Sequence, residues 1–429
     1  MENIRRYLYF GVFLLIVCSV FSAGNPARAK AAEAITLWAW DESFNLKAAK
    51  LAAKEYEREH PEISVQVVTM EQEDIMDKLD NFLASGMYEE LPNIILMEDY
   101  RSKAYLKKYP EEFLDLTEEM DFSSFIDYKV KAVTQEGRQY GIPFDCGAGV
   151  LFYRIDYLTQ AGYSEEDMQE LTWEEFIRIG KEIRDRVNVP LLAVEPDDLG
   201  LIRLMMQSAG SWYVKPGGNE AFIADNEVLK AAESIYEECI REGLTVSVSG
   251  WNQFVNAFQE GEVAAVPYGC WLASSIKEEE TQAGKWRVAE FPRMETVPES
   301  KNASSIGGSS WYILAKKPGS REALEFMKAM FGDNPEFINT LIKEIDLVTA
   351  YKQAEELSNY QAKDDFFGGR NVMELYRRTA LETPEVDFGW NTYAIEDIFS
   401  EELLKIFMGE DRDTAFRRAQ KKAQAVIDS

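Results

Sequence analysis

Two tryptophans and an aspartate stand within four residues of one another near the start of the chain, as Trp38, Trp40 and Asp41. The tryptophans belong to the stretch ITLWAW, which is typical of a β-strand; Asp41 follows it directly, and a stretch with helical periodicity comes next. A buried indole needs an apolar packing partner, and a carboxylate accepts hydrogen bonds from hydroxyl groups. Alternation along the strand places both indoles on one face. We expect one indole to close a core while Trp40 and Asp41 face a bound molecule.

The residues on which many enzymes and metal sites depend are scarce. His60 is the only histidine, and its place before a proline favours a turn over a base or a metal ligand. Cys146, Cys239 and Cys270 are odd in number and widely spaced, so we expect small buried side chains rather than disulfides or a metal site. The motifs of serine nucleophiles, zinc proteases, phosphate loops and EF-hands are absent from the sequence. We therefore expect no cofactor.

The chain is strongly acidic, with 75 Asp and Glu residues against 46 Lys and Arg residues and a formal charge of −29. Such a charge repels nucleic acid and anionic membrane surfaces, so neither is an expected partner. A neutral or cationic ligand fits better. At 429 residues, the chain is long enough for two or three domains whose cores need no disulfide or metal.

The first 31 residues differ from the rest and predict a secretory signal peptide. Two arginines precede an uncharged, largely apolar run from Tyr7 to Ala23, and small residues follow. A retained membrane anchor is the alternative, because the run can just span a bilayer. Cys18 offers a second alternative, a lipid anchor, although Val17 is bulkier than the residue that usually precedes an acylated cysteine. We expect a secreted protein.

The remaining sequence alternates between strand and helix patterns. A first strand, an amphipathic helix, a second strand, a second helix and the buried strand of PNIILMED form a β-α-β-α-β series. This series is typical of a mostly parallel sheet with helices on both faces. Farther along, Thr172 and Glu175 form a capping box at the start of a helix. Trp173, Trp286 and Trp311 are expected to be structural.

Six motifs, in order, resemble the extracellular solute-binding proteins of ABC transporters, the family that contains the maltose-binding protein. They are the opening from Leu37 to Tyr56, PNIILMED with FLDLTE, YGIPFDCGAGVLFYRIDYLTQAG with LTWEEF, AAVPYGCW, GGSSWYILAKK, and TPEVDFGW with its trailing helices. The third motif is the most specific. The resemblance covers essentially the whole chain after the signal peptide.

The resemblance implies an α/β fold of type II with two lobes, each a mixed sheet flanked by helices and joined by hinge crossings. Residues 35–143 and 306–348 would form the N-terminal lobe, and residues 144–305 and 349–429 the C-terminal lobe. It implies a monomer that captures a sugar or oligosaccharide in the cleft and delivers it to a membrane permease. The carboxyl ends of the strands are where such sheets place ligands, and Trp40 and Asp41 stand there.

The resemblance also implies ligand contacts at particular positions. Trp271 and Trp390 match family positions that stack on sugar, with core packing as the alternative for Trp271. Trp212 and Tyr213 follow a helix end where the family often has an aromatic contact. The remaining family positions are Asp99 and Tyr100, which suit polar sugar contacts, and Asp145, which lies near the hinge. For Asp99, an N-cap of the next helix is the alternative.

Three further residues are candidate ligand contacts because of where they lie relative to the expected strands and helices. Glu71 follows the second strand, but a surface glutamate needs no explanation in so acidic a sequence. Ser309 precedes a strand in a glycine-rich segment and can reach a ligand through its backbone. Trp251 precedes a helix and suits either a binding surface or a core.

Two other functions fit parts of the sequence. A secreted glycoside hydrolase would use two carboxylates, but their abundance makes pairing uninformative, and the motif order does not suit one. A sugar-sensing partner of a membrane receptor would use the same closed cleft. We expect a binding protein rather than an enzyme.

Overall fold

The computed structural model describes residues 33–196 and 198–429. The predicted signal peptide and the alternative anchor at Cys18 lie outside these ranges. Within these ranges, no helix is both long and apolar enough to cross a bilayer.

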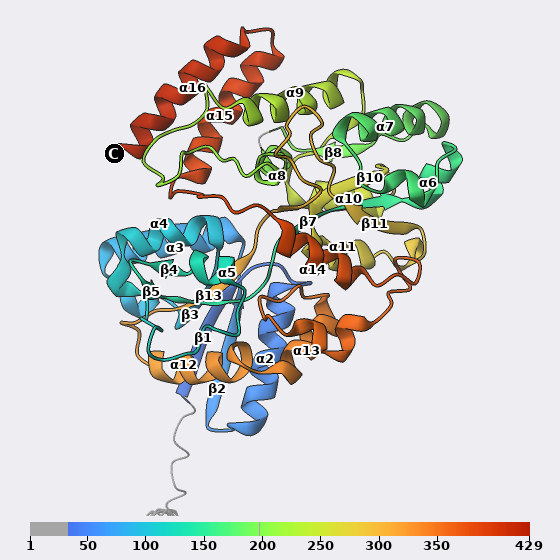
Figure 1. The fold of residues 1–429 in the computed structure, drawn as a ribbon. Helices are drawn as coiled ribbons and strands as arrows, with labels where there is room; N and C mark the ends of the chain where they lie inside the picture. Colours follow the sequence, from blue (N-terminus) through green and yellow to red (C-terminus); the bar gives the residue numbers. More distant parts are fainter. Residues whose placement is uncertain (1–32, 197) are drawn as a thin grey trace, which may run out of the picture.

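The first sheet has five strands in the order β2-β1-β3-β13-β6. The strands are β1 (Glu33–Ala39), β2 (Ile63–Thr69), β3 (Ile94–Glu98), β6 (Gly141–Pro143) and β13 (Ser309–Ile313). Strands β1, β2 and β3 are parallel, as the sequence predicts, while β13 runs antiparallel to β3 and β6. The apolar run of β3 is buried because β3 is a central strand, between β1 and β13, and helices cover both faces of the sheet (Figure 1).

Helices cover both faces of this sheet, and together they form the N-lobe (Figure 1). They are α2 (Asn45–Glu59), α3 (Gln72–Ser85), α4 (Asp99–Lys108), α5 (Asp127–Ala132), α12 (Ser320–Met327) and α13 (Pro335–Ile345), with a short hairpin of β4 (Thr134–Gln135) and β5 (Arg138–Gln139). Alanines dominate the buried face of α2, which lets the helix pack closely on the sheet.

The second lobe, the C-lobe, is built on a sheet in the order β10-β7-β11, with β12 also paired to β7. Its strands are β7 (Ala148–Arg154), β10 (Ala265–Gly269), β11 (Trp286–Glu290) and β12 (Ser304–Ser305), and a parallel pair of β8 (Leu192–Val194) and β9 (Thr245–Ser247) lies beside them. All seven residues of β7 are buried, because strands flank both of its edges and helices pack against it.

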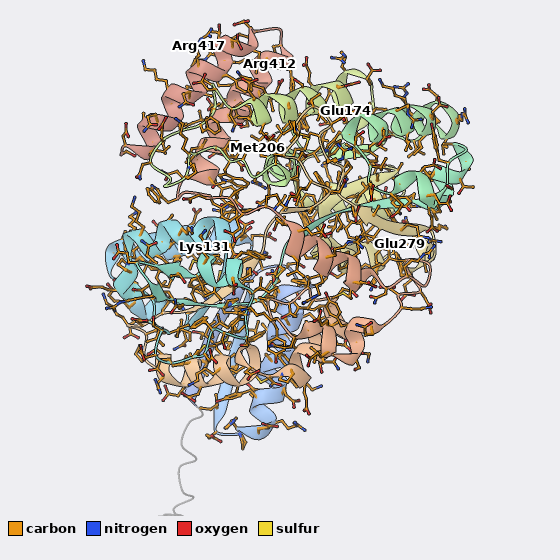
Figure 2. All side chains as sticks on the ribbon, in the orientation of Figure 1. Lys131, Glu174, Met206, Glu279, Arg412 and Arg417 are labelled. Carbon is orange, nitrogen blue, oxygen red and sulfur yellow. The ribbon has the colours of Figure 1, made fainter. Side chains whose placement is uncertain are left out.

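Nine helices surround these strands in the described chain. They are α6 (Ile155–Gln160), α7 (Trp173–Val187), α8 (Gly200–Ser208), α9 (Glu227–Arg241), α10 (Gly250–Gln259), α11 (Ala273–Lys277), α14 (Val372–Glu382), α15 (Thr392–Phe407) and α16 (Arg412–Ile427). The predicted capping box of Thr172 and Glu175 starts α7. Figure 2 shows Arg412 and Arg417 of α16 at the end of the C-lobe farthest from the N-lobe.

Three segments cross between the lobes and hydrogen-bond to one another. The Cys146 amide donates to the Val348 carbonyl at 2.7 Å, and the Ile306 amide donates to the Gly147 carbonyl at 2.8 Å. A Cβ on Gly147 would lie 2.1 Å from the Ile306 carbonyl oxygen, so only glycine permits this approach. The two-lobed fold with hinge crossings is therefore confirmed.

The structural roles predicted for several residues are also confirmed. Trp173, Trp286 and Trp311 are fully buried. The three cysteines of the described chain are buried and free.

Candidate functional site

A pocket open to solvent lies in the C-lobe, where β8 and β10 end and α10 begins. Its volume, with the solvent at its open mouth included, is about 650 Å³. It is lined by Leu192, Ala193, Val194, Glu195, Asp198, Leu201, Tyr236, Trp251, Phe254, Val266, Pro267 and Tyr268. The ends of strands leave side chains facing outward, which is why the lining mixes apolar, aromatic and acidic groups.

The aromatic rings of Trp251, Phe254 and Tyr268 line this pocket, and Trp271 packs beside them; Trp251 and Trp271 were candidates from the sequence. The ring centroids of Trp251 and Trp271 lie 5.8 Å apart, and Tyr268 lies 5.2 Å from Trp271 and 5.2 Å from Phe254. Trp251 is 42% exposed, so its ring has a face free for a ligand. Such a face attracts the C–H side of a sugar ring or another flat, weakly polar group.

The orientation of Trp271 depends on its close neighbours. Its Nε1 donates to the Ile306 carbonyl at 3.2 Å, which ties the aromatic cluster to a hinge crossing. A Cβ on Gly269 would lie 2.3 Å from the same nitrogen, and one on Gly307 would lie 3.2 Å from it. The glycines that flank this tryptophan therefore leave the space that its indole occupies.

Two carboxylates contribute the acidic part of the pocket. Glu195 accepts a hydrogen bond from the Gly250 amide and so fixes the start of α10, which carries Trp251. Asp198 accepts from the Gly200 amide at 2.8 Å and lies 3.4 Å from Arg203. Each carboxylate has further lone pairs that can accept hydrogen bonds from hydroxyl groups.

Charges from both lobes act on the hydroxyl of Tyr268. Burial raises the pKa of Tyr268, the negative charges of Asp198 and Glu98 add to the rise, and Arg203 opposes it. Glu98 ends β3 in the N-lobe, whereas the other groups belong to the C-lobe. The charged side chains that line the pocket are both acidic, Glu195 and Asp198, and the hydrogen bond from Trp271 to the Ile306 carbonyl links the neighbouring aromatic cluster to a hinge crossing.

The opening pair from the sequence lies at the carboxyl end of β1 in the N-lobe. Trp38 is buried in a core cluster, and Trp40 is partly buried against the cores on both faces of the sheet. Asp41 has φ 63° and accepts hydrogen bonds from the Ser43 amide at 3.1 Å and the Phe44 amide at 3.3 Å. Burial raises the pKa of Asp41 although these hydrogen bonds oppose the rise. Asp41 thus shapes the turn into α2.

Three predicted residues lie in a buried polar cluster beside the hinge. Asp99 forms an ion pair with Lys129, whose Nζ also donates to the Ser309 carbonyl at 3.1 Å. Asp145 accepts from both the amide and the hydroxyl of Ser309, at 2.7 and 2.6 Å. Asp99 is the first residue of α4 rather than its N-cap, so the alternative capping role was wrong. The cluster joins the N-lobe to the crossing segments.

Tyr100 and Trp212 meet across the junction of the lobes. Their centroids lie 5.5 Å apart, and Phe388 lies 4.6 Å from Tyr100. Tyr213 is fully buried in the C-lobe core. Trp390 is partly buried, and the Lys107 ammonium lies 3.2 Å from the centroid of its ring.

The structure therefore brings the sequence candidates together in separate groups. Trp251 and Trp271 lie together at the pocket; Asp99, Asp145 and Ser309 lie at the hinge; and Tyr100 and Trp212 lie at the junction. Glu71 is exposed at the start of α3. Sequence reasoning missed Glu195, Asp198 and Tyr268, although Glu195 and Asp198 follow the short apolar run LLAV, whose end marks a strand edge.

The fold and this arrangement describe a two-lobed protein with paired hinge crossings and an aromatic, acidic pocket in its C-lobe. Comparison with known proteins identifies the class more narrowly. The chain belongs to the family of bacterial extracellular solute-binding proteins, which it matches over residues 51–368. The predicted family is thereby confirmed.

Similar proteins extend over nearly the whole chain. The lactose-binding protein of Rhizobium radiobacter is 36% identical over 393 residues, which cover 92% of this chain and 93% of that protein. An arabinooligosaccharide-binding protein of Bacillus subtilis is 22% identical and covers 75% of this chain and 74% of its own. Among solved structures, an ABC-transporter-associated binding protein of B. animalis subsp. lactis, in complex with β-1,6-galactobiose, has a TM-score of 0.78 at 21% identity, covering 92% of this chain and 97% of that one.

Proposed function

We propose that this protein captures a neutral oligosaccharide outside the cell and delivers it to the permease of an ABC transporter, with lactose or a related β-galactoside as the ligand. The relative at 36% identity, named a lactose-binding protein, supports this ligand class. The observation that carries the proposal is the exposed ring of Trp251 at an acidic pocket, beside Trp271 and Tyr268.

The chemistry of the pocket suits a neutral sugar. Indole and phenol rings stack on the C–H face of a pyranose, and Glu195 and Asp198 accept hydrogen bonds from its hydroxyl groups. A carboxylate on the sugar would be repelled by the same acidic side chains. The site therefore favours neutral sugars over their acidic derivatives.

We also propose that the protein moves as two rigid bodies, whose boundaries lie at the segments that cross between the lobes. Residues 35–143 and 306–348 would move as one body, and residues 144–305 and 349–429 as the other. Pairing of the crossing segments at Cys146, Ile306 and Val348 supports boundaries at these places. A ligand that contacts both bodies would bind the closed arrangement more tightly than the open one. This difference in affinity sets how far the equilibrium shifts toward the closed arrangement.

The protein would act as a secreted monomer and would leave the glycosidic bond intact. Membership of a family of extracellular binding proteins supports this role. Lactose incubated with the protein should release no new reducing ends, whereas turnover would favour the hydrolase alternative.

A thermal-shift screen on residues 32–429 tests the ligand. A ligand at one hundred times its Kd stabilises a protein that binds it only when folded by about 2.7 kcal/mol. Lactose should raise the melting temperature, and lactobionate, its carboxylate derivative, should not at the same concentration. If no neutral disaccharide or oligosaccharide shifted the melting temperature, the proposed function would be wrong.

A further inference from the structure

Tyr393 forms a polar contact between the two lobes. It is the second residue of α15 in the C-lobe, and its hydroxyl donates a hydrogen bond to the carboxylate of Glu98, which ends β3 in the N-lobe. Arg101, on α4 of the N-lobe, places its guanidinium 4.1 Å from the centroid of the Tyr393 ring. The ring therefore contacts the other lobe through both its hydroxyl and its face.

The C-lobe holds Tyr393 next to a buried ion pair. Arg203 is 6% exposed and pairs with Glu396, one turn along α15 from Tyr393. Its guanidinium lies 5.5 Å from the Tyr393 ring and 3.4 Å from Asp198, which lines the pocket. A continuous series of polar contacts thus runs from Glu98 of the N-lobe to the edge of the pocket.

The surroundings favour a strong contact at Glu98. Burial raises the pKa of the Glu98 carboxyl, but Arg203, the Tyr393 hydroxyl and Arg101 all favour its charged form. The Glu98 side chain is 13% exposed, and a hydrogen bond to a charged acceptor that is largely shielded from water is stronger than one between neutral groups at the surface. By contrast, Lys131 and Glu385 form an exposed ion pair at 3.3 Å, which water screens. Figure 2 shows Lys131 on the N-lobe, on the side nearest the C-lobe.

We propose that Tyr393 and Glu98 form a clasp that holds the lobes together around the bound sugar, which makes Tyr393 a positioning residue. The inference rests on the proposed function, and it adds a residue that controls how long the sugar stays bound rather than which sugar binds. The two partners lie on different lobes, so hinge opening separates them. The clasp therefore stabilises only the closed arrangement.

The variant Tyr393→Phe tests the clasp because it removes one hydroxyl and keeps the ring. Stopped-flow measurements should show that lactose dissociates about tenfold faster while its association rate changes little. The ratio of affinities between lactose and other neutral disaccharides should stay unchanged. Glu98→Gln keeps a hydrogen-bond acceptor and should lose less affinity than Glu98→Ala.

Tyr376→Phe is the matched control. Tyr376 is a fully buried tyrosine of the C-lobe, whereas Tyr393 is partly buried, and within the described residues the Tyr376 hydroxyl has no hydrogen-bond partner. This variant should bind lactose like the unaltered protein. The clasp is wrong if Tyr393→Phe keeps the original dissociation rate, if its preference among sugars changes, or if Tyr376→Phe loses as much affinity.

Small-angle scattering without sugar separates the clasp from the proposed function. Removing the Tyr393 hydroxyl should shift the population toward open arrangements and increase the radius of gyration. An equal radius for Tyr393→Phe and the unaltered protein would overturn the clasp even if lactose binds. If the unaltered protein bound no neutral sugar, the proposed function would be wrong. The radius of gyration of Tyr393→Phe would still show whether the contact of Tyr393 with Glu98 holds the lobes together.

Discussion

At the scale of single residues, the exposure of Trp251 separates it from most of the other tryptophans. Trp173, Trp212, Trp286 and Trp311 are fully buried, whereas Trp251 is 42% exposed beside the pocket. An exposed indole that adjoins other aromatic rings at a pocket, as Trp251 adjoins Tyr268 and Trp271, is a signature of a binding surface.

Trp251→Ala should therefore weaken lactose binding by roughly tenfold to a hundredfold, because the stacking surface is lost. Stability should change little, since the side chain is not part of the buried core. Isothermal titration calorimetry measures the affinity. Leu381→Ala, which removes another exposed apolar side chain outside the pocket lining, serves as the control and should bind normally. Equal affinities for the two variants would remove Trp251 from the site.

Gly269→Ala tests the packing of Trp271 from the opposite direction. The added methyl group would lie 2.3 Å from the indole nitrogen, so the indole must move. We expect roughly tenfold weaker lactose binding and a destabilisation of about 1–3 kcal/mol, measured by calorimetry and urea unfolding. Gly332→Ala is the matched control, because the added methyl group would lie 3.5 Å from Cε of Met120, an ordinary contact. If the two alanine variants behaved alike, the close approach at Trp271 would not matter.

At the scale of elements, the pairing of α15 with α16 depends on one buried carboxylate. Glu402 of α15 is fully buried and pairs with Arg418 and Lys422 of α16 and with Lys405 on its own helix. Burial alone would raise the pKa of Glu402, but the hydrogen bonds from these three cations outweigh it and lower the pKa to about 2. The charged form therefore stabilises the folded state.

This lowered pKa predicts how stability depends on pH. The contribution of Glu402 should be complete above its ordinary pKa of 4.5 and should be lost as the pH falls from there toward 2. Glu402→Gln should reduce the free energy of unfolding at pH 7 by about 2 kcal/mol, since the partly exposed cations are screened. Chemical unfolding across this pH range provides the measurement.

Glu401→Gln is the control, because its side chain is 66% exposed and pairs only with Lys422 among the described contacts. It should cost little at any pH. A difference between Glu402→Gln and the unaltered protein that stayed constant from pH 7 down to pH 2 would contradict the assignment.

The elements themselves could largely be predicted from the sequence. Alternation and helical periodicity located β1, α2, β2, α3 and β3 to within a few residues, and their parallel order followed from the β-α-β pattern. The sequence pattern of a single segment is sufficient to predict these elements, because each of them buries either one face or one continuous apolar run. The antiparallel insertion of β13 beside β3 depends on residues more than 200 positions apart, and only the resemblance to a family implied a return to the first lobe.

The candidate site could be predicted only in part, for physical reasons. Trp251 and Trp271 stand at strand and helix ends where aromatic residues are conspicuous, and they do lie together at the pocket. Glu195 and Asp198 were hidden among 75 acidic residues. The contact of Glu98 with Tyr393 joins residues from two lobes, and no local pattern encodes it. Asp99 and Asp145 face Lys129 and Ser309 rather than the pocket lining, which the spacing of the residues does not reveal.

At the scale of the whole molecule, the two lobes are joined by paired crossings beside the buried cluster of Asp99, Lys129 and Asp145. An arrangement of this kind concentrates bending at the crossings, because the sheets on either side are rigid. The aromatic cluster beside the pocket is hydrogen-bonded to the Ile306 crossing, and the clasp joins the two lobes. Sugar binding and hinge motion should therefore be coupled.

Small-angle X-ray scattering of residues 32–429 during a lactose titration tests this central claim most directly. The account predicts that the radius of gyration falls as lactose is added and levels off at one sugar per protein, because the ligand favours the closed lobes. A scattering profile that stayed the same from the free protein to saturating lactose and other neutral oligosaccharides would contradict it.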